Sequence, residues 1–262
     1  MEKCPDILLK IVETKRQEIC ELRSKLPDFK AMADNTAPPL DFAEALSSPA
    51  LSVIAEIKKA SPSAGIISEN FNPRKIAEAY LQGGASAISL LTDKHYFKGD
   101  IAFLPEIRDI VTIPILRKDF IIDPLQIYEA RAYGADTFLL IAAILEQSQM
   151  EDLLALGRQL GMEPLVESHN EEELSKTLAA GSSIIGINNR NLHNFEVDIS
   201  LSEKLYPQIP EEAITVAESG ITSAEDARRV KNAGFSAILV GESLMRSGIE
   251  NCGKMILELS DF

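Results

Sequence analysis

Cysteine is scarce in this sequence of 262 residues, and histidine is equally rare. An odd number of widely spaced cysteines argues against a disulfide framework and fits a reducing compartment. Neither residue type shows the paired spacing of a metal site, so we expect no bound metal. The residues concerned are Cys4, Cys20, Cys252, His95, His169 and His193.

Long apolar runs are absent as well. The longest one, from Phe138 to Leu145, has eight residues, against about 20 for a membrane span. The first residues lack the basic start and apolar stretch of a signal peptide. We therefore expect a cytoplasmic protein without a membrane partner.

Basic residues are outnumbered, with 26 Lys and Arg against 40 Asp and Glu and a net charge of −14. Such a surface repels nucleic-acid phosphates and anionic membranes, so neither is expected as a partner. A local cluster of cations can still bind a small anionic substrate. Hydrophobic residues at 45% and charged residues at 25% are typical of a globular protein and exclude collagen, coiled coil or disorder for the whole chain.

The first 48 residues differ in pattern from the rest. Apolar residues recur at three- and four-residue steps over 7–26, which predicts a helix with Asp6, after Pro5, as its N-cap. A break over 34–39 precedes a brief second helix over 41–46. We interpret residues 1–48 as a helical extension of the same domain as residues 49–262.

From residue 52 onward, short apolar runs alternate with helical stretches, as in a parallel sheet buried on both faces. Four glycines, spaced by about 50 residues, each end a helical stretch and predict left-handed helix caps. Eight such units favour a (β/α)8 TIM barrel with an extra N-terminal helical segment. A dinucleotide-binding fold is less favoured, because no Gly-x-Gly-x-x-Gly motif follows any of these strands. The predicted strands are 52–57, 86–91, 113–117, 136–141, 163–167, 183–187, 213–218 and 236–240, and the glycines are Gly84, Gly134, Gly181 and Gly234.

Charged and amide side chains stand at the carboxyl ends of five predicted strands, where barrel active sites lie. Each of them alone could be a solvated strand end or a surface ion pair. Their convergence favours an active site instead, because mixed charges at close range separate pKa values and suit acid–base chemistry. The residues are Glu56, Lys58, Lys118, Glu167, Asn188, Arg190 and Glu218.

The last two predicted strands are followed by Ser219-Gly220 and Gly241-Glu242. Glycine at these places lets backbone N–H groups approach a ligand, and phosphates often bind there in barrels. The alternative is a pair of simple turns. Tyr96-Phe97, after the second strand, could form a wall for an aromatic substrate or only a packed loop.

Seven blocks of this sequence resemble the indole-3-glycerol-phosphate synthase family of tryptophan biosynthesis. The most specific is Ile54-Ala55-Glu56-Ile57-Lys58-Lys59-Ala60-Ser61-Pro62-Ser63. The similarity covers nearly the whole chain, and because the chain ends soon after the last strand we expect no fused second barrel. The other blocks are 91–99, 116–120, 163–167, 186–192, 216–221 and 240–245.

The resemblance implies a carboxy-lyase that needs no metal or organic cofactor. Its substrate would be 1-(2-carboxyphenylamino)-1-deoxyribulose 5-phosphate, which loses CO2 and water as the indole ring closes. The implied catalytic residues are Lys118 as the acid of the condensation, Glu167 as a base, Lys58 as a phosphate ligand and acid, Glu56 and Glu218 as partners of the lysines, and Asn188. The implied binding residues are Ser61, Phe97, Arg190 and Ser219 for the substrate, and Lys58, Gly220, Gly241 and Glu242 for its phosphate.

Other interpretations remain open at this point, as does the question of which lysine acts as the acid in each step. A phosphoribosylanthranilate isomerase would need a Cys and an Asp at strand ends, and no Cys stands at one here. A tryptophan synthase α-like lyase is a second barrel enzyme to consider. A non-catalytic barrel would bind a phosphorylated metabolite or a protein without turnover.

Overall fold

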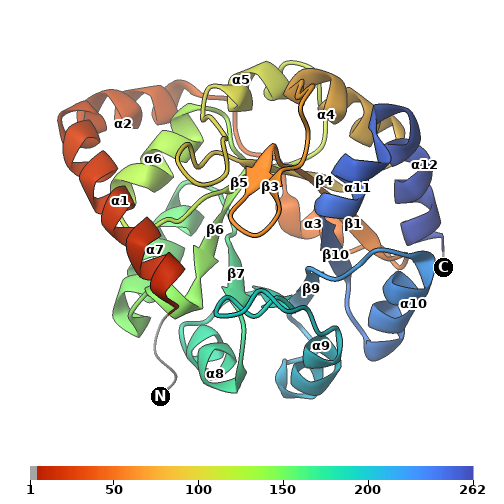
Figure 1. Cartoon of the computed structure of the whole chain (residues 1–262). Coiled ribbons are helices and arrows are strands. Elements are labelled where there is room, and N and C mark those ends of the chain that lie inside the picture. The colour runs from red at the N-terminus through yellow and green to blue at the C-terminus, as the bar shows by residue number, and fades with distance from the viewer. Residues whose placement is uncertain (1–4, 262) are drawn as a thin grey trace.

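The computed structural model describes residues 5–261 and shows a closed barrel of eight parallel strands surrounded by helices (Figure 1). The barrel order is β1-β10-β9-β8-β7-β6-β5-β4, so neighbours in the chain are neighbours in the sheet. The strands are β1 (Ser52–Ile57), β4 (Ala87–Leu91), β5 (Ile115–Lys118), β6 (Thr137–Ile141), β7 (Leu165–Ser168), β8 (Ile184–Asn188), β9 (Ile214–Glu218) and β10 (Ala237–Val240). The TIM-barrel prediction is confirmed.

Helices follow the strands around the outside of the barrel. They are α4 (Pro73–Gln82), α5 (Phe103–Arg108), α6 (Pro124–Ala132), α7 (Gln147–Gln159), α8 (Glu171–Ala179), α9 (Ser200–Leu205), α10 (Ala224–Ala233), α11 (Glu242–Ser247) and α12 (Ile249–Ser260). The four glycines predicted to cap helices all have positive φ, between +77° and +111°. None of the helices within residues 5–261 is long and apolar enough to cross a bilayer.

The N-terminal segment departs from the prediction in detail. Its first helix, α1 (Asp6–Leu22), begins at Asp6 itself, so Asp6 is not the N-cap; Pro5 holds that position. A single helix over 7–26 is also wrong. After a 3-10 turn, α2 (Leu26–Asn35) runs through the start of the expected break, because Pro27 lies in its first turn, where the missing N–H has no helical partner to lose.

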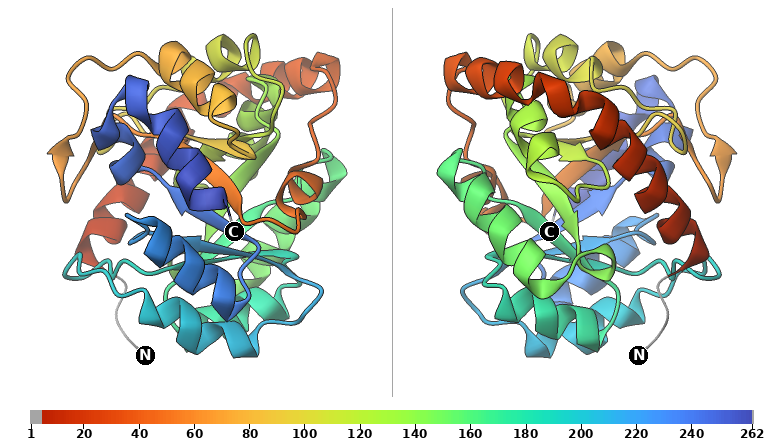
Figure 2. Two further views of the ribbon diagram at one scale, coloured as in Figure 1. Left: turned by 90° about the vertical axis from the view of Figure 1, so that its right-hand side faces the viewer. Right: turned by 90° about the vertical axis from the view of Figure 1, so that its left-hand side faces the viewer.

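The barrel interior is filled by apolar side chains and bounded by helices from the N-terminal segment. The short helix α3 (Phe42–Leu46) places Phe42 and Leu46 in the same buried cluster as the inward side chains of the strands. At the other end, Leu8 and Ile11 of α1 join that cluster. Figure 2 shows α1 and α3 at opposite ends of the barrel, with the hairpin β2 (Ala60–Ser61) and β3 (Gly65–Ile66) on the side of α1.

Candidate active site

A cavity of about 870 Å³ opens at the carboxyl ends of the barrel strands. Among the site residues predicted from sequence, only Ser61 lies outside its lining. The side-chain hydroxyl of Ser61 instead accepts a hydrogen bond from the Ala64 N–H (3.1 Å) within the β2–β3 hairpin, and its neighbours Pro62 and Ser63 face the cavity. The strand ends therefore converge as the barrel geometry predicts.

Lys118, at the end of β5, lies between two carboxylates. Its Nζ is 3.2 Å from Oε2 of Glu167, on β7, and 3.2 Å from Oε2 of Glu218, on β9. All three side chains are at least 86% buried, since only 14% of the Lys118 side chain and less of the others is exposed. Burial alone would lower the pKa of Lys118, but Glu218, Glu167 and Glu56 together raise it above its usual value. Lys118 thus stays protonated.

The pKa values of the two carboxylates beside Lys118 are shifted in opposite directions. Burial raises the pKa of Glu218 to about 8, and the nearby negative charge of Glu167 adds to the effect of burial. Burial would also raise the pKa of Glu167, but Lys118 and His169 outweigh the effect of burial and hold this pKa below its usual range. Glu167 has two cations beside it and Glu218 has one, so the proton shared by the pair belongs on Glu218.

A second ion pair stands at the mouth on β1. Lys58 Nζ lies 2.5 Å from Oε1 of Glu56, and the Glu56 side chain is only 5% exposed. Burial would raise the pKa of Glu56, but Lys58 and Lys118 lower it. Gly241 lies directly against this carboxylate, and a Cβ at that position would collide with Glu56 Oε1.

Gly186, in the middle of β8, lies directly against the Glu218 carboxylate. A Cβ at this position would collide with Glu218 Oε1. Gly186 was not among the predicted site residues. The sequence does contain an indication of its role, because Gly186 interrupts a run of Ile residues. Glycine inside a strand often marks a place where another group approaches the backbone closely.

Arg190 and Glu242 face each other across the cavity rim. Arg190 Nη1 donates to the Phe195 carbonyl (3.3 Å), and its Nη2 is 3.8 Å from Glu242 Oε2. Glu242 is also paired with Arg246 (2.9 Å), so its carboxylate is neutralised by two arginines. Asn188 accepts a hydrogen bond from the Arg190 N–H (3.0 Å), which fixes the start of this loop.

The backbone after β9 is left-handed at two successive residues, Ser219 (φ +64°) and Gly220 (φ +84°). A non-glycine residue in that region is strained, and such strain concentrates at functional sites. A Cβ on Gly220 would collide with Val197. Both residues line the cavity.

Apolar groups form one wall of the cavity. Phe97 packs against Phe120, with ring centroids 5.9 Å apart, and both rings line the cavity. Leu8 and Ile11 of α1 complete this wall. Phe97 therefore has the position that a wall for an aromatic substrate requires.

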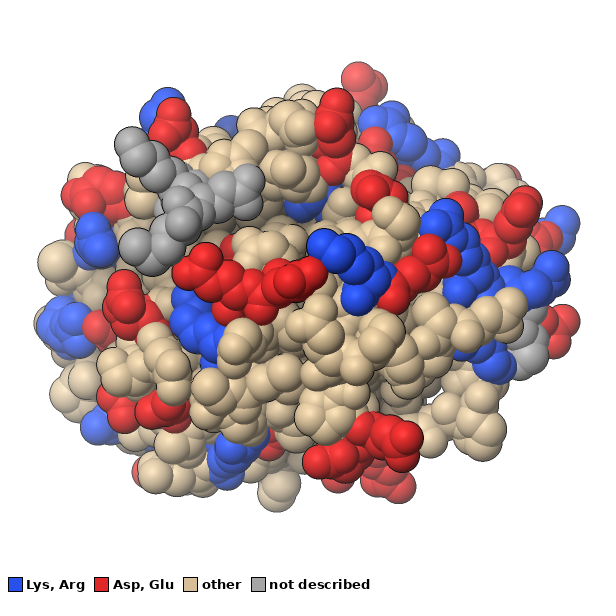
Figure 3. All heavy atoms as spheres, turned by 90° about the horizontal axis from the view of Figure 1, so that it is seen from below, with Lys and Arg blue, Asp and Glu red and all other residues tan. Residues whose placement is uncertain are grey.

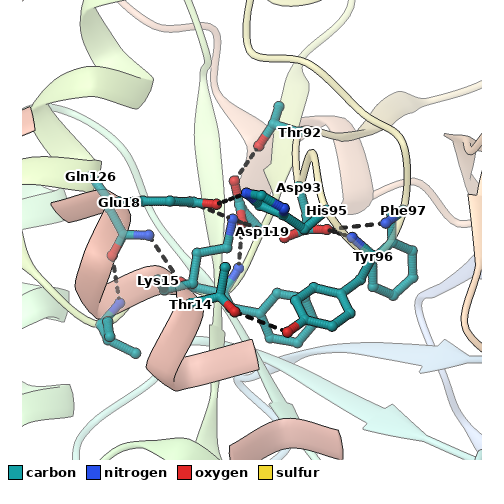
Figure 4. Close-up of polar contacts among 12 residues, drawn as sticks. Thr14, Lys15, Glu18, Thr92, Asp93, His95, Tyr96, Phe97, Asp119 and Gln126 are labelled. Atoms are coloured by element: carbon teal, nitrogen blue, oxygen red, sulfur yellow. Dashed lines mark hydrogen bonds and ion pairs between the residues drawn. The ribbon is translucent and has the colours of Figure 1, made fainter. Parts of the chain in front are cut away.

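Lys15 anchors α1 to the barrel (Figure 4). It is 2% exposed, and its Nζ lies 2.9 Å from Asp93 Oδ2, after β4, and 3.0 Å from Asp119 Oδ1, after β5. Thr14 and the Tyr96 hydroxyl share a second contact, 2.9 Å long, between α1 and the loop after β4. Sequence reasoning missed Lys15, because a lysine among other charged residues of an amphipathic helix is usually solvated.

Metal ligands are not clustered in the described part of the chain, where no group of three or more His, Cys, Asp and Glu side chains is placed to hold an ion. On the face shown in Figure 3, lysine and arginine side chains are interspersed with acidic ones. The cations that matter for an anionic ligand are those of the cavity, chiefly Lys58, Lys118 and Arg190.

The fold and the site together define a (β/α)8-barrel with a cluster of paired lysines and carboxylates at the carboxyl ends of its strands. The model of one protein family, described as indole-3-glycerol phosphate synthase, matches residues 8–259. The chain belongs to the indole-3-glycerol phosphate synthase family.

Relatives of known family are similar to this chain over more than nine-tenths of its length. The indole-3-glycerol phosphate synthase of Desulfotalea psychrophila is 47% identical over 258 residues, covering 97% of this chain and 98% of that protein. The one from Chromobacterium violaceum is 48% identical over 247 residues, covering 92% and 93%. Among solved structures, the thiamine phosphate pyrophosphorylase of Pyrococcus furiosus is 18% identical with a TM-score of 0.58, over 80% of this chain and 93% of that one, and shows the same fold.

Proposed function

We propose that this chain converts 1-(2-carboxyphenylamino)-1-deoxyribulose 5-phosphate to indole-3-glycerol phosphate, releasing one CO2 and one water. Family membership over 8–259 supports the reaction. The observation that carries the assignment of residues is Lys118, held 3.2 Å from both Glu167 and Glu218 at the centre of the cavity. The reaction needs acids, bases and fixed charges, and the chain's own side chains supply them.

Ring closure joins the carboxyl-bearing carbon of the aromatic ring to the ketone carbon of the sugar chain. Negative charge then develops on the ketone oxygen, and the ammonium of Lys118 is placed to donate its proton there. The raised pKa keeps Lys118 protonated beforehand, and the alkoxide that forms is basic enough to take the proton. The ring meanwhile becomes cationic, which the buried carboxylates of Glu56 and Glu167 stabilise.

Decarboxylation restores the aromatic ring as the carbon–carboxylate bond breaks and its electrons return to the ring. Arg190 is placed to hold the carboxylate at the cavity rim, and Asn188 orients the Arg190 backbone. The apolar wall around Phe97 would contact the ring itself. An apolar environment favours this step, because the charge of the carboxylate disappears as CO2 leaves.

In the dehydration step, the hydroxyl is protonated and leaves as water. The neighbouring carbon of the new ring loses a proton to a base. Glu167 is ionised and serves as the base for that carbon. Lys58, 2.5 Å from Glu56, is placed to protonate the departing hydroxyl and to attract the substrate phosphate. The backbone of Gly220 and Gly241, which lines the same side of the cavity, supports a phosphate site there.

The location of the enzyme in the cytoplasm belongs to this proposal too. Support comes from the scarcity of cysteine, which suits a reducing compartment. A small phosphorylated metabolite is the partner that the cations of the cavity suit.

The test is a fluorescence assay of the purified protein with the carboxyphenylamino-deoxyribulose phosphate, in the presence of EDTA. The chain contains no tryptophan, so protein emission does not mask the indole of the product. The proposal predicts growth of indole emission together with release of CO2 in equal amount. A folded protein that gives neither would contradict it.

A further inference from the structure

His169 stands behind the proposed base Glu167 rather than in the cavity. Its Nε2 lies 3.2 Å from Glu167 Oε1, on the far side of the carboxylate from Lys118, which contacts Oε2. The imidazole side chain is 9% exposed and does not line the central cavity. Any effect of His169 on a substrate in that cavity therefore has to pass through Glu167.

The first turn of α8 holds the imidazole from the other side. Glu173 Oε2 lies 3.0 Å from His169 Nδ1 and also accepts the His169 backbone N–H at 2.8 Å. Asn170 donates to Glu173 Oε1 (2.8 Å) and accepts the Glu173 N–H (2.9 Å), which fixes Glu173 in turn. Because each ring nitrogen lies within 3.2 Å of a carboxylate oxygen, negative charge on both sides of the ring favours the imidazolium form.

A charge count shows why a cation is needed at this place. With Glu218 protonated, three carboxylates remain in the connected cluster and three cations face them, so His169 makes the cluster neutral. Without His169, two cations would remain for three carboxylates, of which Glu56 and Glu167 are buried, and this is a costly arrangement. The carboxylates are Glu56, Glu167 and Glu173, and the cations are Lys58, Lys118 and His169.

We propose that His169 is a positioning residue that holds the Glu167 carboxylate fixed and ionised, so that Glu167, and not Glu218, serves as the base. This inference rests on the proposed function. Burial would lower the pKa of His169, but Glu167 and Glu173 raise it to about 10, which keeps the ring cationic at neutral pH. The charged groups that face the Glu167–His169 pair come from four elements and are Glu56, Lys118, Glu173 and Glu218.

His169→Gln tests the proposal, with His193→Gln as the matched control. His193 is exposed in the loop after β8, and the wall of the central cavity does not include it. For His169→Gln we expect kcat to fall on the order of 10- to 100-fold, as for other groups that orient a functional side chain. KM should change little, because His169 does not line the cavity. The control should keep both constants.

The pH profile separates positioning from a structural role. With the imidazolium removed, the pKa of Glu167 rises, so the acid limb of kcat/KM should move to higher pH by about one unit or more. A variant that is merely less stable would lose activity without moving that limb.

Chemical rescue gives a second readout. His169 also lines a neighbouring cavity of about 690 Å³, through which a small heterocycle can reach its place. Imidazole should restore much of the kcat of His169→Ala at neutral pH. Pyrazole has the same shape but stays neutral at that pH, so it should restore little.

The outcomes are distinct. Wild-type enzyme that makes no indole-3-glycerol phosphate would refute the proposed function itself. Active wild type together with an unchanged kcat and pH profile in His169→Gln would overturn the inference about His169 alone. Equal rescue by imidazole and pyrazole would also overturn it, because filling the space would then suffice without charge.

Discussion

Lys15 and Asp119 form a buried ion pair, 3.0 Å long, that ties the N-terminal helix to the strand end carrying Lys118. The Asp119 side chain also accepts hydrogen bonds from Thr92 (2.6 Å) and Arg117 (3.2 Å). The loop after β5 is thus fixed from two sides. The same helix supplies Leu8 and Ile11 to the cavity wall, so its anchor also positions part of the site.

Lys15→Met should destabilise the fold strongly. It leaves Asp93 buried without a cation and Asp119 with Arg117 alone, and breaking a buried pair from one side costs about 3–5 kcal/mol. Urea unfolding should show a lower free energy of unfolding. Lys10→Met, on the exposed side of the same helix, is the control. A Lys15→Met protein as stable as the Lys10→Met protein would mean that the ion pairs are dispensable.

Gly241→Ala should impair catalysis while leaving the fold intact. The new Cβ would collide with Glu56 Oε1, so Glu56 and its partner Lys58 must move. A displacement of about 1 Å at a reacting group can lower the rate up to about 10²-fold.

Steady-state kinetics of Gly241→Ala would show this loss in kcat/KM. Gly253→Ala is a suitable control, because a Cβ there meets only ordinary contacts, the nearest at 3.4 Å. Wild-type kinetics in Gly241→Ala would show that Glu56 can be displaced without consequence.

Glu218→Gln should flatten the pH dependence of stability. The pKa of Glu218 is raised from 4.5 to about 8 on folding, so between these values the folded state holds a proton that the unfolded state has lost. The free energy of unfolding therefore falls as pH rises through this window. Glutamine stays neutral and removes that contribution.

The measurement is urea unfolding between about pH 5 and pH 8.5 for wild type and Glu218→Gln. Glu211→Gln, at an exposed loop position, controls for the loss of one carboxylate. Equal slopes in wild type and Glu218→Gln would show that Glu218 ionises normally in the folded protein.

Most of the barrel could be predicted from sequence, because its strands are buried on both faces and read as uninterrupted apolar runs. The strand β8, for example, is buried throughout and was predicted over 183–187 against Ile184–Asn188 observed. The helix α2 could not be separated from α1 in the same way. Proline is compatible both with the end of a helix and with its first turn, and in the structure Pro27 lies in the first turn of α2, which buries Phe29 and Ala33.

The site was predictable where the barrel geometry alone places a residue. Lys118 and Glu218 end their strands, Glu167 lies one residue before the end of β7, and strand ends meet at one mouth. Lys15 was out of reach because its partners, Asp93 and Asp119, are far away in the sequence. His169 was considered only as a metal ligand, and its role depends on Glu167 and Glu173 meeting it from both sides.

The central claim is that Lys118, between its two carboxylates, performs the ring closure. The most direct measurement is kcat of Lys118→Ala in the indole fluorescence assay, beside Lys254→Ala, whose lysine is 81% exposed on α12. We predict that Lys118→Ala folds and loses about 10²- to 10⁴-fold in kcat, the usual effect of one acid–base group, while Lys254→Ala keeps full activity. Near-normal turnover in Lys118→Ala would contradict the account.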